Sequence, residues 1–345
     1  MATISESVFD AALAFFLAPI QSLMEDESVR EVMINGANQI FIEQDGMLKL
    51  TELRFNDEEQ LNSAVKNIAQ YVGVQLREDV SRFDARLPAG HRVHVVLPPV
   101  ARQGVSITIR KHTKSSFGID ELVRIGSISE ESTSLLAIAM QKEQNMLISG
   151  GTGTGKTTFI NALSALIPNN DRIVTIEDAA ELQLEQEHVV SLETRPADRK
   201  GRGEVTIRDL LHSSLRMRPD RIIVGECRGG EALDLLQAMN TGHGGSMSTV
   251  HANSPVETLR RLETLALFSG EEIPLRFLRA QVASAINVVV QLQRLAGKRT
   301  VATIAEVLPL SDDGEYQTKN IFEYDYSAEA LVRVAEASFE SGGAH

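Results

Sequence analysis

The residues best suited to chemistry form a glycine-rich segment, GGTGTGKT, which runs from Gly150 to Thr157. This segment matches the pattern G-x-x-x-x-G-K-[ST] at every fixed position. Its glycines let the backbone curl so that successive N–H groups face one anion. We expect the Lys156 side chain to reach the β- and γ-phosphates of ATP and the Thr157 hydroxyl to ligate Mg²⁺. The expected phosphate-binding residues are Gly151, Thr152, Gly153, Thr154, Gly155, Lys156, Thr157 and Thr158.

The segments on either side support this interpretation. Residues 145–149 contain the apolar triplet Met146-Leu147-Ile148, which fits a buried strand, although periodicity alone does not separate strand from helix here. The following TFINALSALI predicts a helix, and the positive end of its dipole would add to the anion site. Strand, glycine-rich loop and helix in this order distinguish a phosphate-binding loop from a glycine-rich turn without a ligand.

Hydrolysis of ATP also needs an acidic group that positions water. The segment RIIVGECR, residues 221–228, predicts a central strand with Glu226 just beyond its carboxyl end, which is where sites lie in parallel sheets. Gly225 stands in the place of the usual strand-end aspartate. Glu226 is therefore expected to orient or deprotonate the water. The alternative is a solvated loop carboxylate.

A second strand, RIVTIED at 172–178, also ends in carboxylates. We expect Glu177 to act as a second catalytic acid, through Mg²⁺ or through water. A strand-end carboxylate that only caps the following turn is the alternative. The metal ligands predicted from the sequence are thus Thr157 and Glu177, partly through water.

Two histidines lie in the segment TGHGGSMSTVHAN, residues 241–253. His243 and His251 are each expected to sense the γ-phosphate, because histidine changes charge near neutral pH. Either could instead be a hydrogen-bonded structural histidine. They do not form a zinc set, since four well-spaced ligands are absent from the sequence.

Several arginines are candidates to neutralise charge in the transition state from a neighbouring subunit. Arg102 and Arg110 lie on or beside an expected strand of the N-terminal region, and Arg216 and Arg218 lie in LRMRPDR. Each could also be an ordinary surface ion pair. The basic run at 195–202 is most simply a solvated loop, with phosphate contact or partner docking as the alternative.

The elements that must position these residues fall into two regions. Residues 1–111 predict an α+β domain, with a hairpin at 39–51, strands at 92–97 and 104–111, and a helix at 57–72 capped by Asn56 and Glu59. Residues 112–129 are polar and rich in Ser and Gly, and predict a linker. From residue 130 to 345, strands alternate with helices, which predicts an α/β domain with a mostly parallel sheet covered on both faces.

Composition narrows the class of protein. The chain has 345 residues, 43% of them hydrophobic, and a net charge of −13. The net negative charge, together with the lack of a domain rich in Lys and Arg, argues against nucleic acid as a partner. The apolar run at 11–20 is too short to span a bilayer and predicts a packed helix, so membrane contact is expected to be peripheral. Cys227 is the single cysteine, which fits a reducing, cytoplasmic compartment.

Four blocks now stand in order: GGTGTGKT, IVTIEDAAE, RPDRIIVGECRGGEALDLLQAMNTGH and GSMSTVHANSP. Together they resemble the phosphate loop, acidic box, divergent strand-end box and histidine box of the type II/type IV secretion traffic ATPases. The stretches IEDAAELQLEQEHVVSLETRP and GEVTIRDLL are similar to the CpaF/TadA group, the motors of Tad (Flp) pilus assembly.

The resemblance implies a sensor-like N-terminal domain, a RecA-like P-loop ATPase domain and a homo-hexameric ring with ATP between domains and subunits. It makes Glu177 the acidic-box residue, Glu226 the catalytic glutamate, and His243 and His251 the histidine box. It also implies a motor at the cytoplasmic face of the inner membrane that acts on a membrane platform protein.

Three other functions remain open at this point. The nearest is the related ATPase of type IV secretion or conjugation. A RecA-like DNA helicase or translocase is a second alternative, disfavoured by the acidic charge and by the lack of basic patches interleaved with aromatic residues. A non-catalytic nucleotide switch is a third.

Overall fold

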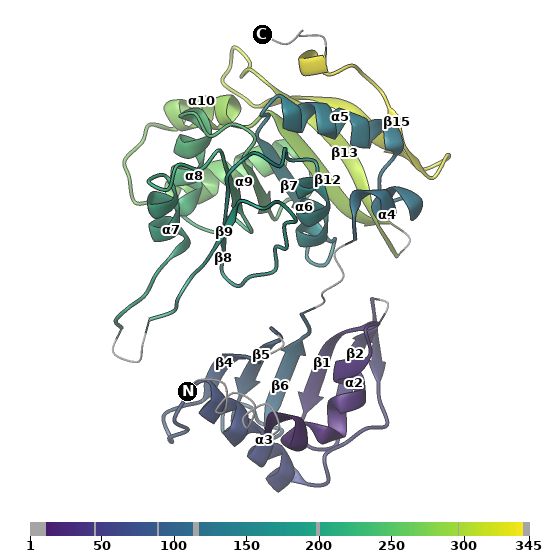
Figure 1. Ribbon diagram of the computed structural model, residues 1–345, viewed down its shortest axis with the longest axis vertical. Helices are drawn as coiled ribbons and strands as arrows, with labels where there is room; N and C mark the ends of the chain where they lie inside the picture. The colour runs from purple at the N-terminus through teal and green to yellow at the C-terminus, as the bar shows by residue number, and fades with distance from the viewer. Residues whose placement is uncertain are drawn as a thin grey trace. The chain divides into compact units, whose positions relative to one another are not determined.

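The computed structural model describes residues 12–44, 46–87, 90–112, 117–197, 201–295 and 297–340. The chain divides into two compact units, Met1–Ser115 and Ser116–His345, and each is described by itself (Figure 1). Within the described residues, no helix combines the length and the apolar character that crossing a bilayer requires.

The first unit is an antiparallel sheet with helices packed on it. Its described residues form six strands in the order β3-β2-β1-β6-β5-β4. The strands are β1 (Val29–Asn35), β2 (Ile40–Gln44), β3 (Met47–Leu50), β4 (Arg82–Arg86), β5 (Arg92–Val96) and β6 (Ser106–Arg110). The helices are η1 (Ala18–Ile20), α2 (Gln21–Glu25) and α3 (Glu58–Tyr71). The predicted hairpin, helix and two strands are confirmed, whereas β1 and β4 were not predicted; Asp45 of the hairpin turn lies outside the described residues.

The helix α3 packs through the apolar stripe that its sequence predicts. Leu61, Val65 and Ile68 are buried in one cluster with Val32 and Ile34 of β1. Residues 12–16 are also helical, and Leu13, Leu17 and Ile20 join the same cluster, so the early apolar run is a packed segment as expected.

The predicted cap of α3 is wrong by one residue. The carboxylate of Asp57 accepts a hydrogen bond from the Gln60 backbone N–H at 2.7 Å, and the Gln60 side chain in turn accepts from the Asn56 N–H at 2.7 Å. The cap is therefore Asp57 with Gln60 rather than Asn56 with Glu59, because Asp57 is the last residue with an extended backbone.

The second unit is built on a mainly parallel sheet. Its described residues form nine strands in the order β15-β14-β13-β12-β7-β11-β10-β8-β9. From β12 to β9 neighbouring strands are parallel, and β13 to β15 add antiparallel strands at one side. The strands are β7 (Met146–Gly150), β8 (Ile173–Glu177), β9 (Val189–Glu193), β10 (Arg221–Val224), β11 (Met247–Val250), β12 (Val288–Leu295), β13 (Lys298–Leu308), β14 (Gln317–Asp325) and β15 (Ala330–Arg333). The α/β class is thus confirmed; β14 and β15 were not predicted.

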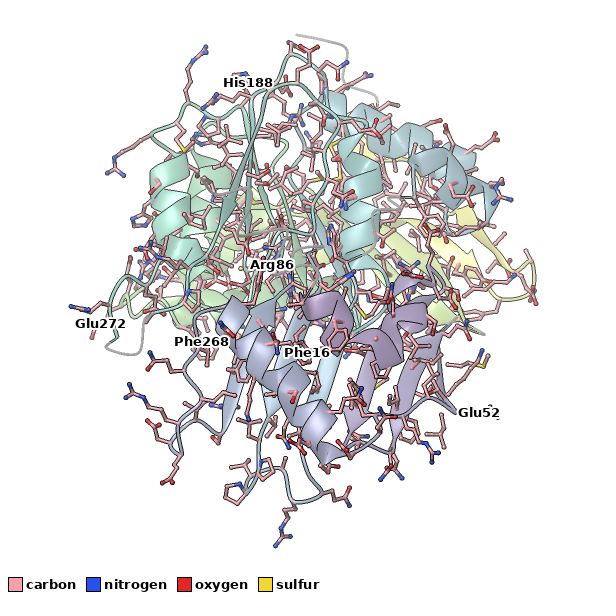
Figure 2. All side chains as sticks on the ribbon, turned by 60° about the horizontal axis from the view of Figure 1, so that its bottom comes forward. Phe16, Glu52, Arg86, His188, Phe268 and Glu272 are labelled. Carbon is pink, nitrogen blue, oxygen red and sulfur yellow. The ribbon has the colours of Figure 1, made fainter. Side chains whose placement is uncertain are left out.

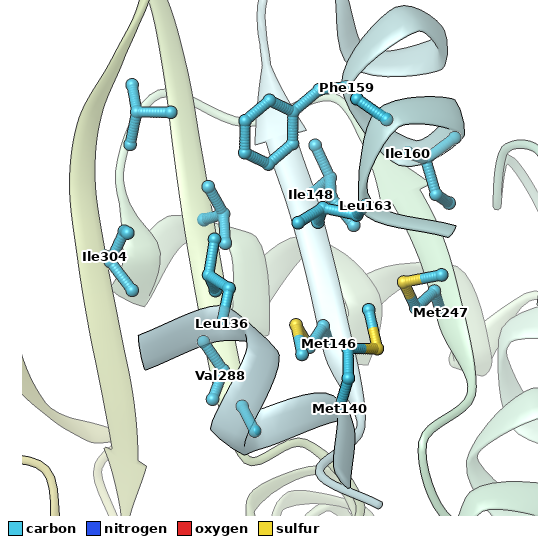
Figure 3. Packing of buried hydrophobic residues seen from close by; sticks show 14 of the residues in the cluster. Leu136, Met140, Met146, Ile148, Phe159, Ile160, Leu163, Met247, Val288 and Ile304 are labelled. Carbon is cyan, nitrogen blue, oxygen red and sulfur yellow. The ribbon is translucent and has the colours of Figure 1, made fainter. Parts of the chain in front are cut away.

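Helices cover both faces of this sheet. They are α4 (Ile119–Arg124), α5 (Glu130–Gln141), α6 (Lys156–Ser164), α7 (Ile207–Ser214), α8 (Glu231–Asn240), α9 (Pro255–Leu267), α10 (Leu275–Ala285) and η2 (Ser338–Glu340). Alternate residues of β7 enter two different cores: Met146 and Ile148 pack with α5 and α6, whereas Leu147 packs with α7 to α10. Figure 3 shows Met146 and Ile148 of β7 surrounded by Leu136, Phe159 and Leu163.

The predicted linker at 112–129 needs a correction. Helix α4 forms inside it, and Leu122 and Ile128 are buried in the core of the second unit. Ile119, Leu122 and Val123 follow helical spacing, so this stretch carries an apolar stripe that its Ser and Gly content obscured. The second unit therefore begins before residue 130.

Candidate nucleotide site

The phosphate loop connects β7 to α6 at the carboxyl edge of the parallel sheet. It begins at Gly150, the last residue of β7, and ends at Gly155, which caps α6 with a left-handed backbone, φ +92°. A Cβ on Gly150 would lie 2.6 Å from the Leu292 carbonyl oxygen and 2.6 Å from the Thr154 hydroxyl oxygen. Both positions therefore require glycine, one for space and the other for conformation.

The Lys156 side chain is folded onto its own loop. Its exposed fraction is 8%, and Nζ donates to the carbonyl oxygens of Gly150 and Gly151, each at 2.9 Å. Nζ also lies 3.4 Å from Nδ1 of His251. A phosphate oxygen is a stronger, charged acceptor than a carbonyl oxygen, so this ammonium group is placed to exchange the carbonyls for a polyphosphate.

Glu226 lies at the same edge, directly after β10. Its Oε1 is 3.0 Å from His251 Nε2, and its Oε2 is 2.7 Å from Arg228 Nη2. Burial alone would raise the pKa of Glu226, but the hydrogen bond from Arg228 and the charges of Arg228, His251 and Lys156 hold that pKa below its usual value. The carboxylate is therefore ionised at neutral pH, as a group that orients water must be.

His251 joins the lysine to the glutamate. Burial and the positive charge of Lys156 lower the pKa of the imidazole, against the opposing effect of Glu226. A neutral ring with its proton on Nε2 donates to Glu226 and accepts from Lys156 at Nδ1, which satisfies both contacts. Lys156, His251, Glu226 and Arg228 thus form one continuous chain of polar contacts.

Glu177 occupies the space that Gly225 leaves open. A Cβ on Gly225 would lie 3.0 Å from Glu177 Cγ, so the carboxylate of β8 passes beside the position where an aspartate of β10 would stand. Glu177 is buried, and its Oε1 accepts from the N–H groups of Glu181 at 2.9 Å and Leu182 at 3.0 Å. One oxygen of Glu177 therefore caps the turn after β8, as the alternative interpretation of this carboxylate expected. The same side chain also lies beside Gly225, the residue before Glu226.

The donors near the loop suit a magnesium ion that is held largely by the nucleotide. The described residues contain no group of three or more His, Cys, Asp or Glu side chains arranged to hold a metal by themselves. Mg²⁺ in nucleotide sites usually binds one or two protein groups, water and substrate phosphates. Thr157 in the first turn of α6 and Glu177 at the carboxyl end of β8 offer the oxygen ligands of that pattern.

Three predicted site residues lie at the other edge of the sheet. His243 precedes β11, with Nδ1 3.2 Å from the Ala238 carbonyl oxygen, and the four residues of β11 separate it from His251 by roughly 13 Å. Arg216 and Arg218 precede β10, and Arg216 Nη1 donates to the His212 carbonyl oxygen at 2.9 Å. Within one subunit the structure therefore brings none of these three residues to the Lys156 loop, and a role for them at a γ-phosphate stays a prediction.

In the first unit, the structure separates the two predicted arginines. Arg102 precedes β6 and Arg110 ends it, so the length of the strand lies between them. Arg110 is the cross-strand partner of Arg92, and Arg92 is the partner of Arg86 (labelled in Figure 2). Direct partners share one face of a sheet. Glu31 of β1 is the next direct partner of Arg110, and the charge of Arg110 acts on its carboxyl group, so this row of arginines ends beside an acidic residue.

Comparisons with known proteins identify the family of this chain. A model of the type II/IV secretion system protein family, T2SSE, matches residues 16–321. A Mycobacterium tuberculosis protein provisionally named a conjugal transfer protein is 36% identical over 293 residues, 83% of each chain. Conjugal transfer protein TrbB of Rhizobium radiobacter is 34% identical, covering 86% of this chain and 89% of its own. Type IV secretion system protein VirB11 of Bartonella quintana is 32% identical, covering 84% and 91%.

Solved structures share the fold. The pilus retraction motor PilT, solved with ADP, has a TM-score of 0.60 and 20% identity over 88% of this chain and 84% of its own. The ATPase DotB of Legionella pneumophila has a TM-score of 0.58 and 20% identity over 88% and 82%. Since the family model spans most of the chain and the relatives exceed 30% identity over more than four fifths of it, this chain belongs to the type II/type IV secretion traffic ATPases.

Proposed function

We propose that this protein binds ATP with Mg²⁺ at the Lys156 loop and hydrolyses it to drive a secretion machine. The observation that supports this most directly is the chain of contacts from Lys156 through His251 to Glu226. It joins the group expected to hold the phosphates to the carboxylate expected to orient water. A solvated loop carboxylate would have no reason to be linked in this way.

The residues act in a definite order in this proposal. Incoming phosphates draw the Lys156 ammonium group away from the carbonyls of Gly150 and Gly151. Glu226 then orients the attacking water, and His251 adjusts to the loss of its contact with the lysine. Mg²⁺ would be held by Thr157 and Glu177 and would neutralise charge on the phosphates.

The relatives favour one machine over another. The sequence resemblance pointed to Tad pilus assembly, with type IV secretion or conjugation as the alternative. The named relatives VirB11 and TrbB are type IV secretion and conjugal transfer proteins. We therefore propose a type IV secretion or conjugation ATPase ahead of a Tad pilus motor. The genes next to this one would separate the two, since channel and relaxase genes accompany one and prepilin genes the other.

Assembly into a homo-hexamer completes the proposal. Neither Arg216 nor Arg218 lies at the nucleotide edge of its own subunit. Cations that act beside Lys156 and Arg228 in the transition state would therefore come from a neighbouring subunit or from the first unit. In the first unit, Arg102 and Arg110 are the candidates for this role. We place the ring in the cytoplasm, at the inner face of the membrane, acting on a membrane-embedded platform protein.

The experiment compares two substitutions. Lys156→Ala removes the ammonium group and should abolish ATP binding. Glu226→Gln keeps the shape of the side chain but removes the charge, and should retain ATP while turnover falls at least 100-fold. Lys298→Ala, which removes an exposed charge on β13, serves as the charge-matched control. Affinity from fluorescent ATP analogues and phosphate release are the measurements, and unchanged turnover in Glu226→Gln would contradict the assignment.

The same assays test the other functions. ATPase activity stimulated by DNA, with a steep dependence on salt, would indicate a DNA translocase. ATP binding without turnover by the assembled ring would indicate a nucleotide switch.

A further inference from the structure

A buried glutamine lies next to the phosphate loop but outside the set of predicted site residues. Gln291 is in β12, directly opposite Ser149 of β7, and its exposed fraction is 2%. Ser149 is the residue before Gly150, so this pairing fixes the point where the loop begins.

Both ends of the Gln291 amide are used. Its Oε1 accepts a hydrogen bond from the Ser149 hydroxyl. Its Nε2 donates to the Ala252 carbonyl oxygen at 3.1 Å and to the Leu292 carbonyl oxygen at 3.3 Å. Ala252 follows His251 beyond the end of β11, outside the backbone ladder of the sheet.

These bonds cross three strands. The sheet order is β12-β7-β11, so the side chain extends from β12, past the end of β7, to the turn after β11. One amide therefore connects the start of the phosphate loop with the backbone of His251. Leu292, the next residue of β12, also packs against Gly150, because a Cβ there would lie 2.6 Å from its carbonyl oxygen.

An apolar side chain would fill this position at lower cost if packing were its only role, since a buried amide must satisfy donors as well as acceptors. We propose that Gln291 is a positioning residue for ATP hydrolysis, which fixes the distance between the Lys156 loop and His251. This inference rests on the proposed ATPase function. It predicts that loss of the amide slows turnover more than it weakens ATP binding.

The first test is Gln291→Leu, which keeps the approximate volume and removes every side-chain hydrogen bond. We expect ATP affinity to stay within about threefold of wild type and kcat to fall on the order of 10- to 100-fold, the scale of a misplaced catalytic group. Gln293→Leu is the matched control, because it makes the same change two residues along the same strand. Equal kcat in Gln291→Leu and wild type would overturn the proposal, as would a loss confined to ATP affinity.

The second test follows the His251 imidazole itself and does not require turnover. Its NMR signals can be assigned by their loss in His251→Gln. In Gln291→Leu the ring should titrate at higher pH than in wild type, because it is no longer held against Lys156 in a buried position. An unchanged titration with a lowered melting temperature would mean that Gln291 only stabilises the fold, and would overturn the proposal.

Rescue by a conservative variant is the third test. In Gln291→Glu, burial raises the pKa of the new carboxyl group. Its protonated form can still donate to Ala252 and accept from Ser149, whereas the ionised form faces the Ala252 carbonyl without a donor. The ratio of kcat in Gln291→Glu to kcat in wild type should therefore rise as pH falls. A ratio that does not depend on pH would count against the proposal. Absence of ATP binding by the wild-type ring would instead refute the proposed function.

Discussion

Both edges of the parallel sheet in the second unit carry charged residues that make polar contacts, but these contacts differ in exposure and in role. At the carboxyl edge, a chain of contacts runs from the buried Lys156 through His251 and Glu226 to the exposed Arg228. At the amino edge, the Arg221 side chain is 3% exposed and its Nε lies 2.6 Å from Asp171 Oδ2.

The charged residues at the amino edge stabilise the fold through buried contacts of Arg221. Arg221 Nη2 also donates to the Met140 carbonyl oxygen at 2.9 Å, and a Cβ on Gly245 would overlap its guanidinium group. The glycine-rich turn that contains His243 therefore makes room for a buried arginine. At this edge, the charged Arg221 at the start of β10 therefore has a structural role, which its position in the sequence alone does not reveal.

The largest expected effect is on stability at the amino edge. Arg221→Leu leaves the partly buried Asp171 carboxylate without its partner, and should lower the free energy of unfolding by about 3 kcal/mol. Arg216→Leu, at an exposed arginine of the same edge, should change it by less than about 0.5 kcal/mol. Chemical denaturation measures both. Equal effects of the two substitutions would show that the buried pair has no special role.

The two histidines provide the next comparison. His251→Gln breaks the connection between Lys156 and Glu226 and should lower kcat on the order of 100-fold. His243→Gln, at the opposite edge, should leave kcat within about twofold in the isolated subunit. Steady-state ATPase assays with melting curves separate activity from folding. If kcat fell further in His243→Gln than in His251→Gln, the assignment of the carboxyl edge as the reactive edge would be wrong, or His243 would act at a contact between subunits.

A smaller effect is expected from crowding Glu177. Gly225→Ala would place a methyl group 3.0 Å from Glu177 Cγ and push the carboxylate aside. The Mg²⁺ concentration that supports half-maximal activity should rise about tenfold, close to 1.4 kcal/mol. Gly118→Ala is the control, since a Cβ there meets nothing within 4 Å. Unaltered Mg²⁺ dependence in Gly225→Ala would argue against Glu177 as a metal-linked acid.

The smallest effect concerns pH. Arg228 holds the pKa of Glu226 below its usual value, so Arg228→Ala should raise that pKa. Because the proposed role of Glu226 requires its ionised form, the acid limb of the kcat profile should move to higher pH. The pair is exposed on the arginine side, so stability should change by less than about 1 kcal/mol. A shift of the acid limb to lower pH would contradict the assignment of Glu226 as the base.

Local spacing was enough to predict the glycine-rich loop between a strand and a helix, the position of Glu226 beyond β10, and most of the strands. These features depend on residues within about ten positions of one another, and the glycines and the strand-end carboxylate report directly on backbone geometry. The segment at 241–253 shows what local spacing leaves open, because it does not say whether His243 and His251 lie at one site. The strand β11 runs through that segment and carries its two histidines to opposite edges.

By itself, the sequence determined which side chains can do chemistry, because the phosphate loop and its helix are specified by neighbouring residues. Only the tertiary structure decided which of them meet. The row of Arg86, Arg92 and Arg110 depends on strand register, and the bond between Ser149 and Gln291 joins residues 142 positions apart. Glu177 comes to lie beside Gly225 only because β8 and β10 are neighbours in the sheet. Contacts between distant segments follow from strand order and packing, which no local pattern encodes.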